Sequence, residues 1–365
     1  MLRTLTTVEA IDGVTVRVQG RDVVSWCTND YLGLSVHPQV IEAASAAARR
    51  WGVGARASRL LGGTTALHTQ LEERLAEFFH ADAALVYPSG YLANLGTLST
   101  LLGPEDVVVI DRLAHASLVD ACRLSRARLR VFSHNDPDHL AAVLARETTA
   151  RRRVVVTEGL FSMNGDYAPL QALREITRRA EALLYVDDAH GAFASGATGR
   201  GTPELQGVAH GDFLYIGTLG KALGCQGGFV VGARAFITLL HNRARPFLYS
   251  TALACPVVGA ALAALQLVQE DPAPRARVAA LVARWHARYP AGAVQSYIVP
   301  VLLGSASRAV DAAQRLWQRG HFAPAIRPPT VPRGTARLRV SLSALPAEAP
   351  LDRLCEALEA LGVTP

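Results

Sequence analysis

The sequence predicts an α/β protein in which a large, mostly parallel sheet domain precedes a smaller C-terminal α+β domain. Seven short apolar runs rich in β-formers alternate with amphipathic stretches up to residue 250, where the pattern changes. Strands that alternate with helices form parallel sheets covered on both faces. Half of the 365 residues are hydrophobic, so the chain is long and apolar enough for two packed domains.

The large domain is predicted over residues 36–250, after an N-terminal segment of residues 1–35. Its strands are expected at Ala83–Tyr87, Val107–Ile110, Leu129–Phe132, Val154–Thr157, Leu183–Val186, Phe213–Ile216 and Gly228–Val231. Amphipathic helices are expected at Leu67–Phe79, His139–Arg146 and Leu170–Ala182.

The smaller domain is predicted over residues 251–365. It begins with a helix rich in alanine, leucine and valine from Pro256 to Gln269, and a further helix follows Pro274. The remaining elements are a strand near Tyr297–Leu302, a helix near Ser307–Arg319, a strand near Ala336–Leu342 and a last helix at Leu351–Leu361.

The composition argues against a membrane protein, an exported protein or a disulfide framework. The N-terminus has no continuous apolar segment of the secretory kind, and the longest apolar stretch, Ala254–Leu265, is shorter than the ~20 residues that span a bilayer. The five cysteines are scattered and show no Cys-x-x-Cys spacing, which argues against a zinc site. We expect a cytoplasmic protein that holds no metal.

The charge is mildly basic, with 37 basic and 31 acidic residues and a net charge of +6. The excess is spread along the chain and forms no basic block, so nucleic-acid binding is not expected. It favours an anionic substrate or partner, although a solvated basic surface is the simpler explanation.

The distribution of the basic residues is more informative, because 36 are arginine and only Lys221 is lysine. A guanidinium stays protonated, whereas an ε-amine can lose its proton, act as a base and form a Schiff base. Chemistry therefore explains the exception better than the chance survival of a surface lysine.

Residues that directly follow predicted strands deserve inspection, because ligands of open α/β sheets bind at the carboxyl ends of the strands. Asp187 follows the strand at Leu183–Val186, and His190 follows three residues later. An aspartate buried there can keep a pyridine nitrogen protonated and make the ring an electron sink. The Asp-x-x-His pattern alone fits a metal pair or a capped loop equally well.

The glycine-rich stretch Gly217–Gly224 follows another predicted strand and contains Lys221. Its glycines allow a ligand to approach the backbone, and the hydroxyl of Thr218 can hold a phosphate. The stretch is not a nucleotide-binding P-loop, because that motif needs glycine where Tyr215 stands and serine or threonine where Ala222 stands.

Two further strand ends carry candidate ligand contacts. The N–H groups of Ser89–Tyr91 open the predicted helix at Leu92–Leu102, and a helix N-terminus binds anions, although Ser89 as a plain N-cap explains the pattern as well. His115 follows Val107–Ile110 and can lie flat on an aromatic ring, although a lone loop histidine is more often structural.

Taken together, the motifs resemble the α-oxoamine synthase family of fold-type-I pyridoxal-phosphate enzymes. The matching stretches run almost from end to end of the chain. They are Thr28–Leu34, Asp111–Leu118, Val156–Asp166, Val186–Gly191, Thr218–Lys221 and Arg327–Pro332.

The resemblance implies a fold-type-I transferase that binds pyridoxal 5'-phosphate, with Lys221, Asp187 and His115 as its catalytic residues. Lys221 corresponds to the lysine bound covalently to the cofactor, Asp187 to the partner of the pyridine nitrogen and His115 to the ring that stacks on it. Ser162 and His190 correspond to residues near the phenolic oxygen, and Gly90, Tyr91 and Thr218 to phosphate or ring contacts.

The resemblance also implies residues that bind the substrates. Asn29 and Arg339 correspond to the ligands of the amino-acid carboxylate, and Arg3 and Thr330 fall on acyl-substrate positions. His115 is also assigned to the substrate-binding residues. The family is dimeric with its site between subunits, which makes Thr251 a candidate phosphate contact to the partner's cofactor. The chain lacks most of the usual N-terminal helix, and residues 52–63 differ from the commoner family spelling.

The activity implied by the resemblance is the decarboxylative condensation of L-alanine with pimeloyl-CoA, or pimeloyl carrier protein, for biotin synthesis. The stretch Arg327–Pro332 favours this over the relatives that use glycine. Glycine C-acetyltransferase and acyltransferases of secondary metabolism remain alternatives. A catalytically silent partner subunit is the alternative from another class, but Lys221, Asp187 and His115 are all present.

Overall fold

The computed structural model describes residues 5–290, 296–345 and 348–363. Contacts group the chain into two compact units. Unit 1 comprises Met1–Gly33, Ser162–Asp166 and Pro272–Pro365, and unit 2 comprises Leu34–Phe161 and Tyr167–Asp271. The domain boundaries predicted after residues 35 and 250 stay a prediction, and the grouping by contacts assigns residues 251–271 to unit 2.

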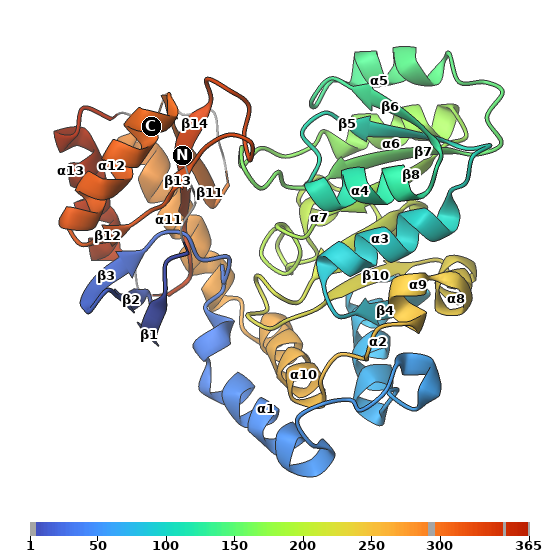
Figure 1. Cartoon of the computed structure of the whole chain (residues 1–365), viewed down its shortest axis with the longest axis horizontal. Coiled ribbons are helices and arrows are strands. Elements are labelled where there is room, and N and C mark those ends of the chain that lie inside the picture. The colour runs from blue at the N-terminus through green and yellow to red at the C-terminus, as the bar shows by residue number, and fades with distance from the viewer. Residues whose placement is uncertain (1–4, 291–295, 346–347, 364–365) are drawn as a thin grey trace. The chain divides into compact units, whose positions relative to one another are not determined.

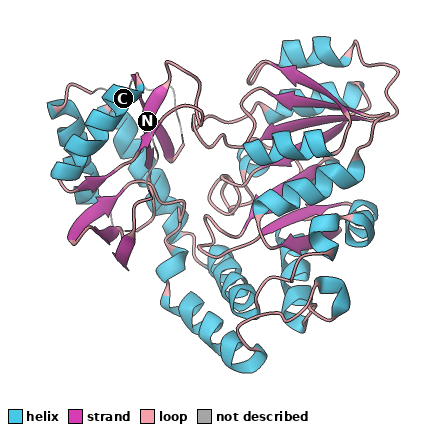
Figure 2. Ribbon diagram, in the orientation of Figure 1, coloured by secondary structure: helices cyan, strands magenta, loops and turns pink. Residues whose placement is uncertain are grey.

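Unit 2 is built on a seven-stranded sheet with the order β4-β10-β9-β8-β7-β5-β6. Figure 2 shows its strands surrounded by helices. In chain order the strands are β4 (Ala83–Tyr87), β5 (Val107–Asp111), β6 (Arg128–Phe132), β7 (Arg153–Glu158), β8 (Leu183–Asp187), β9 (Leu214–Thr218) and β10 (Gly228–Gly232). The seven strands expected from the sequence are therefore present, with ends that differ by one or two residues.

The sheet is parallel apart from one strand. β6, β5, β7, β8 and β9 pair in parallel, whereas β10 runs antiparallel to both of its neighbours, β9 and β4. Every residue of β5, β9 and β10 is buried, as expected for strands covered on both faces. The carboxyl ends of six strands consequently lie along one edge of the sheet.

The helices of unit 2 cover both faces of this sheet. Figure 1 shows α3 and α4 side by side in front of the strands. The helices are α1 (Pro38–Trp51), α2 (Ala66–Phe78), α3 (Gly90–Leu101), α4 (Ala116–Leu124), α5 (Pro137–Leu144), α6 (Leu170–Arg179), α7 (Thr202–Leu205), α8 (Arg234–Arg243), α9 (Arg245–Leu248) and α10 (Cys255–Glu270). Short 3-10 turns are η1 (Leu34–Val36), η2 (Arg59–Leu61) and η3 (His210–Asp212).

The described residues of unit 1 form two small sheets and three helices. A four-stranded sheet has the order β1-β2-β3-β12, and a three-stranded sheet has the order β11-β14-β13. The strands are β1 (Val8–Asp12), β2 (Thr15–Val18), β3 (Arg21–Ser25), β11 (Ile298–Gly304), β12 (His321–Phe322), β13 (Ala325–Ile326) and β14 (Ala336–Ser341). The helices are α11 (Ala273–Arg288), α12 (Ala306–Gln318) and α13 (Glu348–Ala360).

The N-terminal strands β1–β3 are an element that the sequence prediction missed. Gly13, which has a positive φ of 57°, and Val14 form the turn between β1 and β2 and directly follow Asp12. An Asp-Gly pair is a common hairpin signal. The valines of β2 and β3 supply the buried side chains Val16, Val18 and Val23. The period-two pattern was therefore present in β2 and β3, whereas every residue of β1 is exposed, including its apolar Val8 and Ile11.

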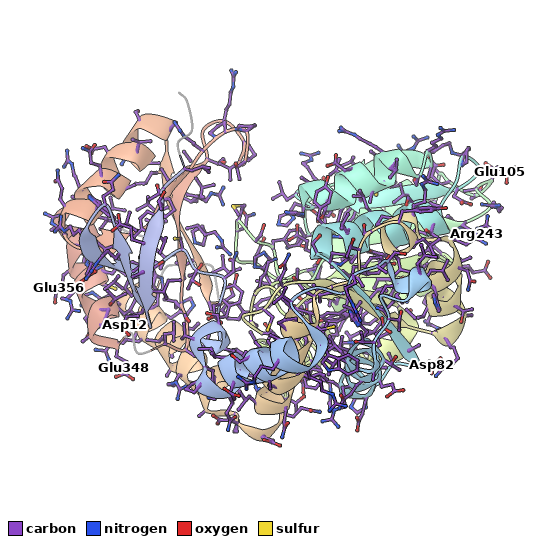
Figure 3. All side chains as sticks on the ribbon, turned by 60° about the horizontal axis from the view of Figure 1, so that its bottom comes forward. Asp12, Asp82, Glu105, Arg243, Glu348 and Glu356 are labelled. Carbon is purple, nitrogen blue, oxygen red and sulfur yellow. The ribbon has the colours of Figure 1, made fainter. Side chains whose placement is uncertain are left out.

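The surface is polar and mixed in sign. Figure 3 shows acidic Asp82 and Glu105 and basic Arg243 extending outward from unit 2. Among the described residues, no helix has the length and apolar content needed to cross a bilayer. The described part of the chain also holds no group of three histidine, cysteine or acidic side chains placed to bind a metal ion.

Two buried histidines predict an acid-dependent loss of stability. Burial lowers the pKa of His210 and of His321 to about 4 in the folded protein. His321 Nδ1 accepts a hydrogen bond of 3.1 Å from the indole of Trp26, so its ring is held neutral. An unfolded histidine binds its proton near pH 6.5, so each neutral ring stabilises the fold above that pH, and the contribution is lost as pH falls towards 4.

The apoprotein should therefore unfold more easily at pH 5 than at pH 7, with roughly 2 kcal/mol of stability lost for each of these histidines. Burial also raises the pKa of Asp188 to about 7, so this group stabilises the fold more as pH falls and opposes the effect of the histidines. The test must therefore compare variants. The unfolding midpoint of His321→Phe should fall less between pH 7 and pH 5 than that of the wild type. The exposed His241→Gln should behave as the wild type does, and an unchanged slope in His321→Phe would contradict the prediction.

Candidate active site

A cavity of about 210 Å³ lies at the carboxyl edge of the unit 2 sheet. Its walls come from the ends of β7, β8 and β9 and from the starts of α3 and α4. The lining residues are Gly90, Tyr91, Asn94, His115, Ser117, Glu158, Asp187, Ala189, His190, Thr218 and Lys221. Seven residues that the sequence predicted for the cofactor site, namely Gly90, Tyr91, His115, Asp187, His190, Thr218 and Lys221, are thus brought together.

Lys221 follows β9 by three residues and presents its amine to the cavity. Nζ lies 2.8 Å from Nε2 of His190, which is 6% exposed. The glycine-rich loop permits tight packing, because a side chain at Gly224, whose φ is +64°, would collide with the backbone of Ser35. The structure thus holds the chain's single amine of this kind at a fixed place in the cavity.

Asp187 is the last residue of β8 and its side chain is buried. Oδ1 accepts the backbone N–H of Ala189 at 3.0 Å, and Oδ2 accepts the amide of Asn94 at 2.6 Å. Both partners are donors, so the carboxylate serves as an acceptor in each bond. A buried carboxylate of this kind is suited to hold a protonated ring nitrogen.

The N-terminus of α3 forms an anion site next to Thr218. The hydroxyl of Ser89 caps the N–H of Leu92 at 3.2 Å, which leaves the N–H groups of Gly90 and Tyr91 without an intrahelical acceptor. The hydroxyl of Thr218 donates to the carbonyl of Gly227 at 2.7 Å, so it must rotate before it can donate to a phosphate.

His115 and Tyr91 line the open side of the cavity. Desolvation lowers the pKa of His115, Lys221 lowers it further, and Asp187 and Asp120 act in the opposite direction. The hydroxyl of Tyr91 donates to Asp120 at 2.6 Å, and this bond raises the pKa of the phenol. Both rings are accessible from solvent, as is required of side chains that meet an incoming ligand.

Sequence reasoning missed four residues of this cavity lining, namely Glu158, Ala189 and the buried pair Asn94 and Ser117. Both residues of this pair are 1% exposed, and Asn94 links Asp187 to Ser117 by hydrogen bonds of 2.6 and 2.9 Å. The available signal was an asparagine near the start of the uncharged, leucine-rich helix Leu92–Leu102, since a buried amide needs partners.

The neighbouring Asp188 has a structural position outside the cavity lining. It accepts hydrogen bonds from the backbone and hydroxyl of Thr202 at 2.6 and 2.7 Å and from the hydroxyl of Tyr215 at 3.0 Å. Any side chain at Gly159, Gly191 or Gly201 would collide with its carboxylate. Asp188 therefore fastens the loop after β8 to α7 and β9.

Arg339 lies in unit 1, on β14, and is 7% exposed. Nε donates to the carbonyl of Ser162 at 2.6 Å, and Nη1 donates to Asn29 and Ser341 at 3.1 Å each. Nη2 donates to the hydroxyl of Tyr31 at 3.0 Å, and burial raises the pKa of that phenol. The alternative that Arg339 is a strand residue with its charge in water is thereby excluded.

The other residues predicted for the site do not line the unit 2 cavity. Ser162 belongs to unit 1, where its carbonyl accepts from Arg339. Thr330 is exposed in a turn closed by its N–H and the carbonyl of Arg327. Thr251 is exposed and forms an isolated bridge with Ser58, while Arg3 falls outside the described residues. Their predicted roles remain proposals.

The groups around the cavity fit pyridoxal phosphate. Lys221 supplies an amine for a covalent bond to an aldehyde, buried Asp187 supplies a partner for a ring nitrogen, and the start of α3 supplies donors for a phosphate. Each group is fixed by contacts of its own, because His190 holds Lys221, Asn94 holds Asp187 and Ser89 caps the helix.

Comparisons with known proteins agree with this chemistry. The chain matches the family described as "Aminotransferase class I and II" over residues 21–358. It is 48% identical over 364 residues to the 8-amino-7-oxononanoate synthase of Anaeromyxobacter dehalogenans, with 98% of this chain and 91% of that protein covered. It is 46% identical over 369 residues to the enzyme of the same name from Geobacter sulfurreducens, with 99% and 94% covered.

Solved structures show the same fold. A serine palmitoyltransferase variant from S. paucimobilis with bound PLP and myriocin has a TM-score of 0.93 and 31% identity, covering 98% of this chain and 93% of that one. The 8-amino-7-oxononanoate synthase from Francisella tularensis has a TM-score of 0.80 and 27% identity, covering 93% and 96%. The chain therefore has the fold of a type I pyridoxal-phosphate enzyme, and it belongs to the class I and II aminotransferase family and, within it, to the 8-amino-7-oxononanoate synthases.

Proposed function

We propose that this protein is a pyridoxal-phosphate-dependent C-acyltransferase that converts L-alanine and a pimeloyl thioester into 8-amino-7-oxononanoate for biotin synthesis. The thioester carbonyl carbon forms a bond to Cα of alanine, the thiol leaves, and the alanine carboxylate departs as CO2. The observation that carries the proposal is a cavity in which the only lysine meets a buried carboxylate and an open helix N-terminus. The names and identities of the relatives support the choice of substrates.

Lys221 has two roles in this proposal. Its amine holds the cofactor covalently between turnovers, and during turnover the same amine removes the proton from Cα of alanine. Bound in the cavity, pyridoxal phosphate supplies an electron sink for the electrons of the bond that breaks at Cα. His190, 2.8 Å from Nζ, orients the amine for both tasks.

The remaining lining residues hold and orient the ring. Asp187 keeps the ring nitrogen protonated, and His115 stacks on the ring and contacts the substrates. Gly90, Tyr91 and Thr218 bind the phosphate or the ring, and the backbone donors at the start of α3 contribute to the same contact. Ser162 and His190 are proposed for the phenolic oxygen, and of these His190 lines the cavity.

Arg339 and Asn29 are proposed to bind the α-carboxylate of alanine. Four of the five guanidinium N–H groups donate to described residues, so Arg339 is rigidly oriented and offers one further donor. A fixed carboxylate would restrict the rotation of alanine about its Cα bonds, and would thus select which bond at Cα breaks. Charge and preorganisation therefore both favour Arg339 for this role.

Arg339→Ala should weaken L-alanine binding by about 2–4 kcal/mol, because the substrate carboxylate would lose its charged partner. Affinity for the acyl thioester should change much less. The measurement is a titration of the cofactor absorbance with L-alanine. Arg337→Ala is the matched control, since Arg337 is equally buried but donates to Met163 and Asn164. An unchanged dissociation constant in Arg339→Ala would remove it from the site. Weaker binding in Arg337→Ala would then assign the role to Arg337, and Arg327 would be tested next.

Several proposals concern the second substrate and the assembly. Arg3 and Thr330 are proposed for the acyl substrate, and Thr251 for the phosphate of the cofactor in a partner subunit of a homodimer. The protein is proposed to act in the cytoplasm. The exposed position of Thr251 supports its availability to a second chain.

A panel of amino acids and acyl thioesters tests the proposed function directly. L-Alanine with a pimeloyl thioester should release CO2 and free thiol and form the amino ketone, whereas glycine and serine should react much more slowly. Pimeloyl-CoA and pimeloyl carrier protein should be compared as the two possible carriers. Faster condensation of glycine with a short acyl thioester would instead support a glycine C-acetyltransferase, and no condensation with any pair would refute the proposal.

A further inference from the structure

A continuous chain of hydrogen bonds connects Asp187 to His115 beneath the cavity. Asn94 Nδ2 donates to Asp187 Oδ2 at 2.6 Å and to Ser117 Oγ at 2.9 Å. Ser117 Oγ in turn lies 2.7 Å from His115 Nδ1. The chain runs from the end of β8, through the middle of α3, to the start of α4.

The amide of Asn94 has only one orientation that satisfies its neighbours. A carboxylate can only accept, so the NH2 group must face Asp187. Oδ1 then faces Tyr185, whose hydroxyl donates to it at 2.8 Å. Tyr185 and Asp187 are two residues apart on β8, so their side chains lie on the same face of the strand and contact the two ends of one amide.

The same reasoning fixes the proton of His115. The backbone N–H of Ser117 lies 3.2 Å from Nδ1 and can only donate, so Nδ1 carries no proton. The hydroxyl of Ser117 accepts from Asn94, which leaves its own hydrogen to donate to Nδ1. The proton of a neutral His115 is consequently on Nε2.

We propose that Asn94 is a positioning residue of the cofactor site, which holds Asp187 directly and, through Ser117, holds His115 in the tautomer with its proton on Nε2. One buried amide thereby links Asp187, which is assigned to the nitrogen of the cofactor ring, to His115, which is assigned to stacking on that ring. The inference rests on the proposed function for its significance, but its geometry concerns the protein alone.

Asparagine suits this position better than its nearest substitutes. Aspartate would place a second carboxylate 2.6 Å from Asp187. Leucine would remove the hydrogen bonds that Asn94 makes with Tyr185, Ser117 and Asp187. Asn94 is 1% exposed and uses both hydrogens of its amide as well as its oxygen, so the cost of burying an amide is offset in full.

The proposal distinguishes two substitutions. Ser117→Ala removes the hydroxyl that joins Asn94 to His115 and leaves the bond from Asn94 to Asp187, whereas Asn94→Leu removes both links of Asn94. Ser99→Ala is the matched control, because Ser99 lies on the same helix and its hydroxyl donates to the carbonyl of Leu95. Far-UV circular dichroism of each apoprotein establishes that it is folded.

The first measurement is the tautomer of His115 in the apoprotein, read from long-range ¹H–¹⁵N correlations and assigned with His115→Gln. Because Asp187, Asp120 and Lys221 all bear on this ring, every spectrum is recorded at one pH at which it is neutral. Wild type and Ser99→Ala should carry the proton on Nε2. In Ser117→Ala and Asn94→Leu only the longer bond from the backbone N–H of Ser117, 3.2 Å from Nδ1, still favours this tautomer, so a measurable fraction of His115 should carry its proton on Nδ1.

The second measurement is the dissociation constant of pyridoxal phosphate. Asn94→Leu should weaken binding by roughly tenfold or more, since it leaves buried groups unsatisfied, whereas Ser117→Ala should change it by less than about threefold. A wild-type His115 with its proton on Nδ1, or a folded Asn94→Leu with unchanged tautomer and affinity, would overturn the proposal. If Asn94→Leu does not fold, the wild-type and Ser117→Ala tautomers decide. An absence of condensation activity with these results intact would refute the proposed function and leave the positioning role standing.

Discussion

Lys221→Arg should produce a folded protein that has lost the yellow colour of the bound cofactor and several orders of magnitude of turnover. Arginine keeps the positive charge and a similar length, but its guanidinium neither forms an imine in water nor gives up a proton at neutral pH. Anchoring and proton removal are therefore lost together. Visible absorbance, the condensation assay and circular dichroism measure the three expected results.

Borohydride reduction of the wild-type holoenzyme tests the same residue independently. Because the chain has a single lysine, the cofactor should become fixed at Lys221, and the only other primary amine is the N-terminal one. Arg243→Lys is a matched control that adds a lysine on the exposed surface of unit 2, where no label is expected. Labelling of that residue to the same extent, or turnover retained in Lys221→Arg, would show that Lys221 is not the anchor.

Asp187→Asn should still bind the cofactor but should exchange the Cα proton of L-alanine several orders of magnitude more slowly. An amide preserves the size of the side chain and can still accept from Asn94, but it cannot hold a ring nitrogen in its protonated form by charge. The electron sink is therefore weakened while the cavity is retained. Proton exchange in deuterated solvent, followed by NMR, measures this step without the second substrate.

The adjacent carboxylate provides the control for this prediction. Asp188 is buried but does not line the cavity, and its three donors come from Thr202 and Tyr215. Asp188→Asn should lower the unfolding temperature, because the amide NH2 would face a donor, while exchange in the folded holoenzyme stays close to the wild-type rate. Wild-type exchange in Asp187→Asn would mean that the electron sink is controlled by another group.

The strand ends explain why much of the cofactor cavity could be predicted from the sequence. Strands β8 and β9 are short, buried and mostly apolar, so Asp187 and Thr218 stand out as their last residues and Lys221 stands out three residues after β9. In a parallel sheet the carboxyl ends of the strands lie along one edge. These residues can therefore be predicted to lie close together without knowing any long-range contact. The local pattern was therefore sufficient to bring these residues into one cavity.

Other features depend on contacts between distant residues and carry no local signal. The bond from Arg339 to Asn29 joins residues 310 positions apart, and the bond from Asn94 to Asp187 joins residues 93 positions apart. The sequence suggested Asn29 and Arg339 only through the family resemblance, and it gave no reason to pair Asn94 with Asp187. The exposed strand β1 was missed because its residues contribute nothing to a buried face.

The parallel pairing of β3 with β12 has a consequence for the order in which the protein is completed during synthesis. The guanidinium of Arg21 donates to the carbonyl of Gln318, 297 residues later, and Val24 pairs with His321. The N-terminal strands β1–β3 therefore leave the ribosome long before their partner β12 exists, whereas all strands of unit 2 have been synthesised once residue 232 has been made. Translation therefore completes the large sheet before the sheet of β1, β2, β3 and β12 has all of its strands. A nascent chain arrested before residue 318 should show protease protection in unit 2 but none in β1–β3.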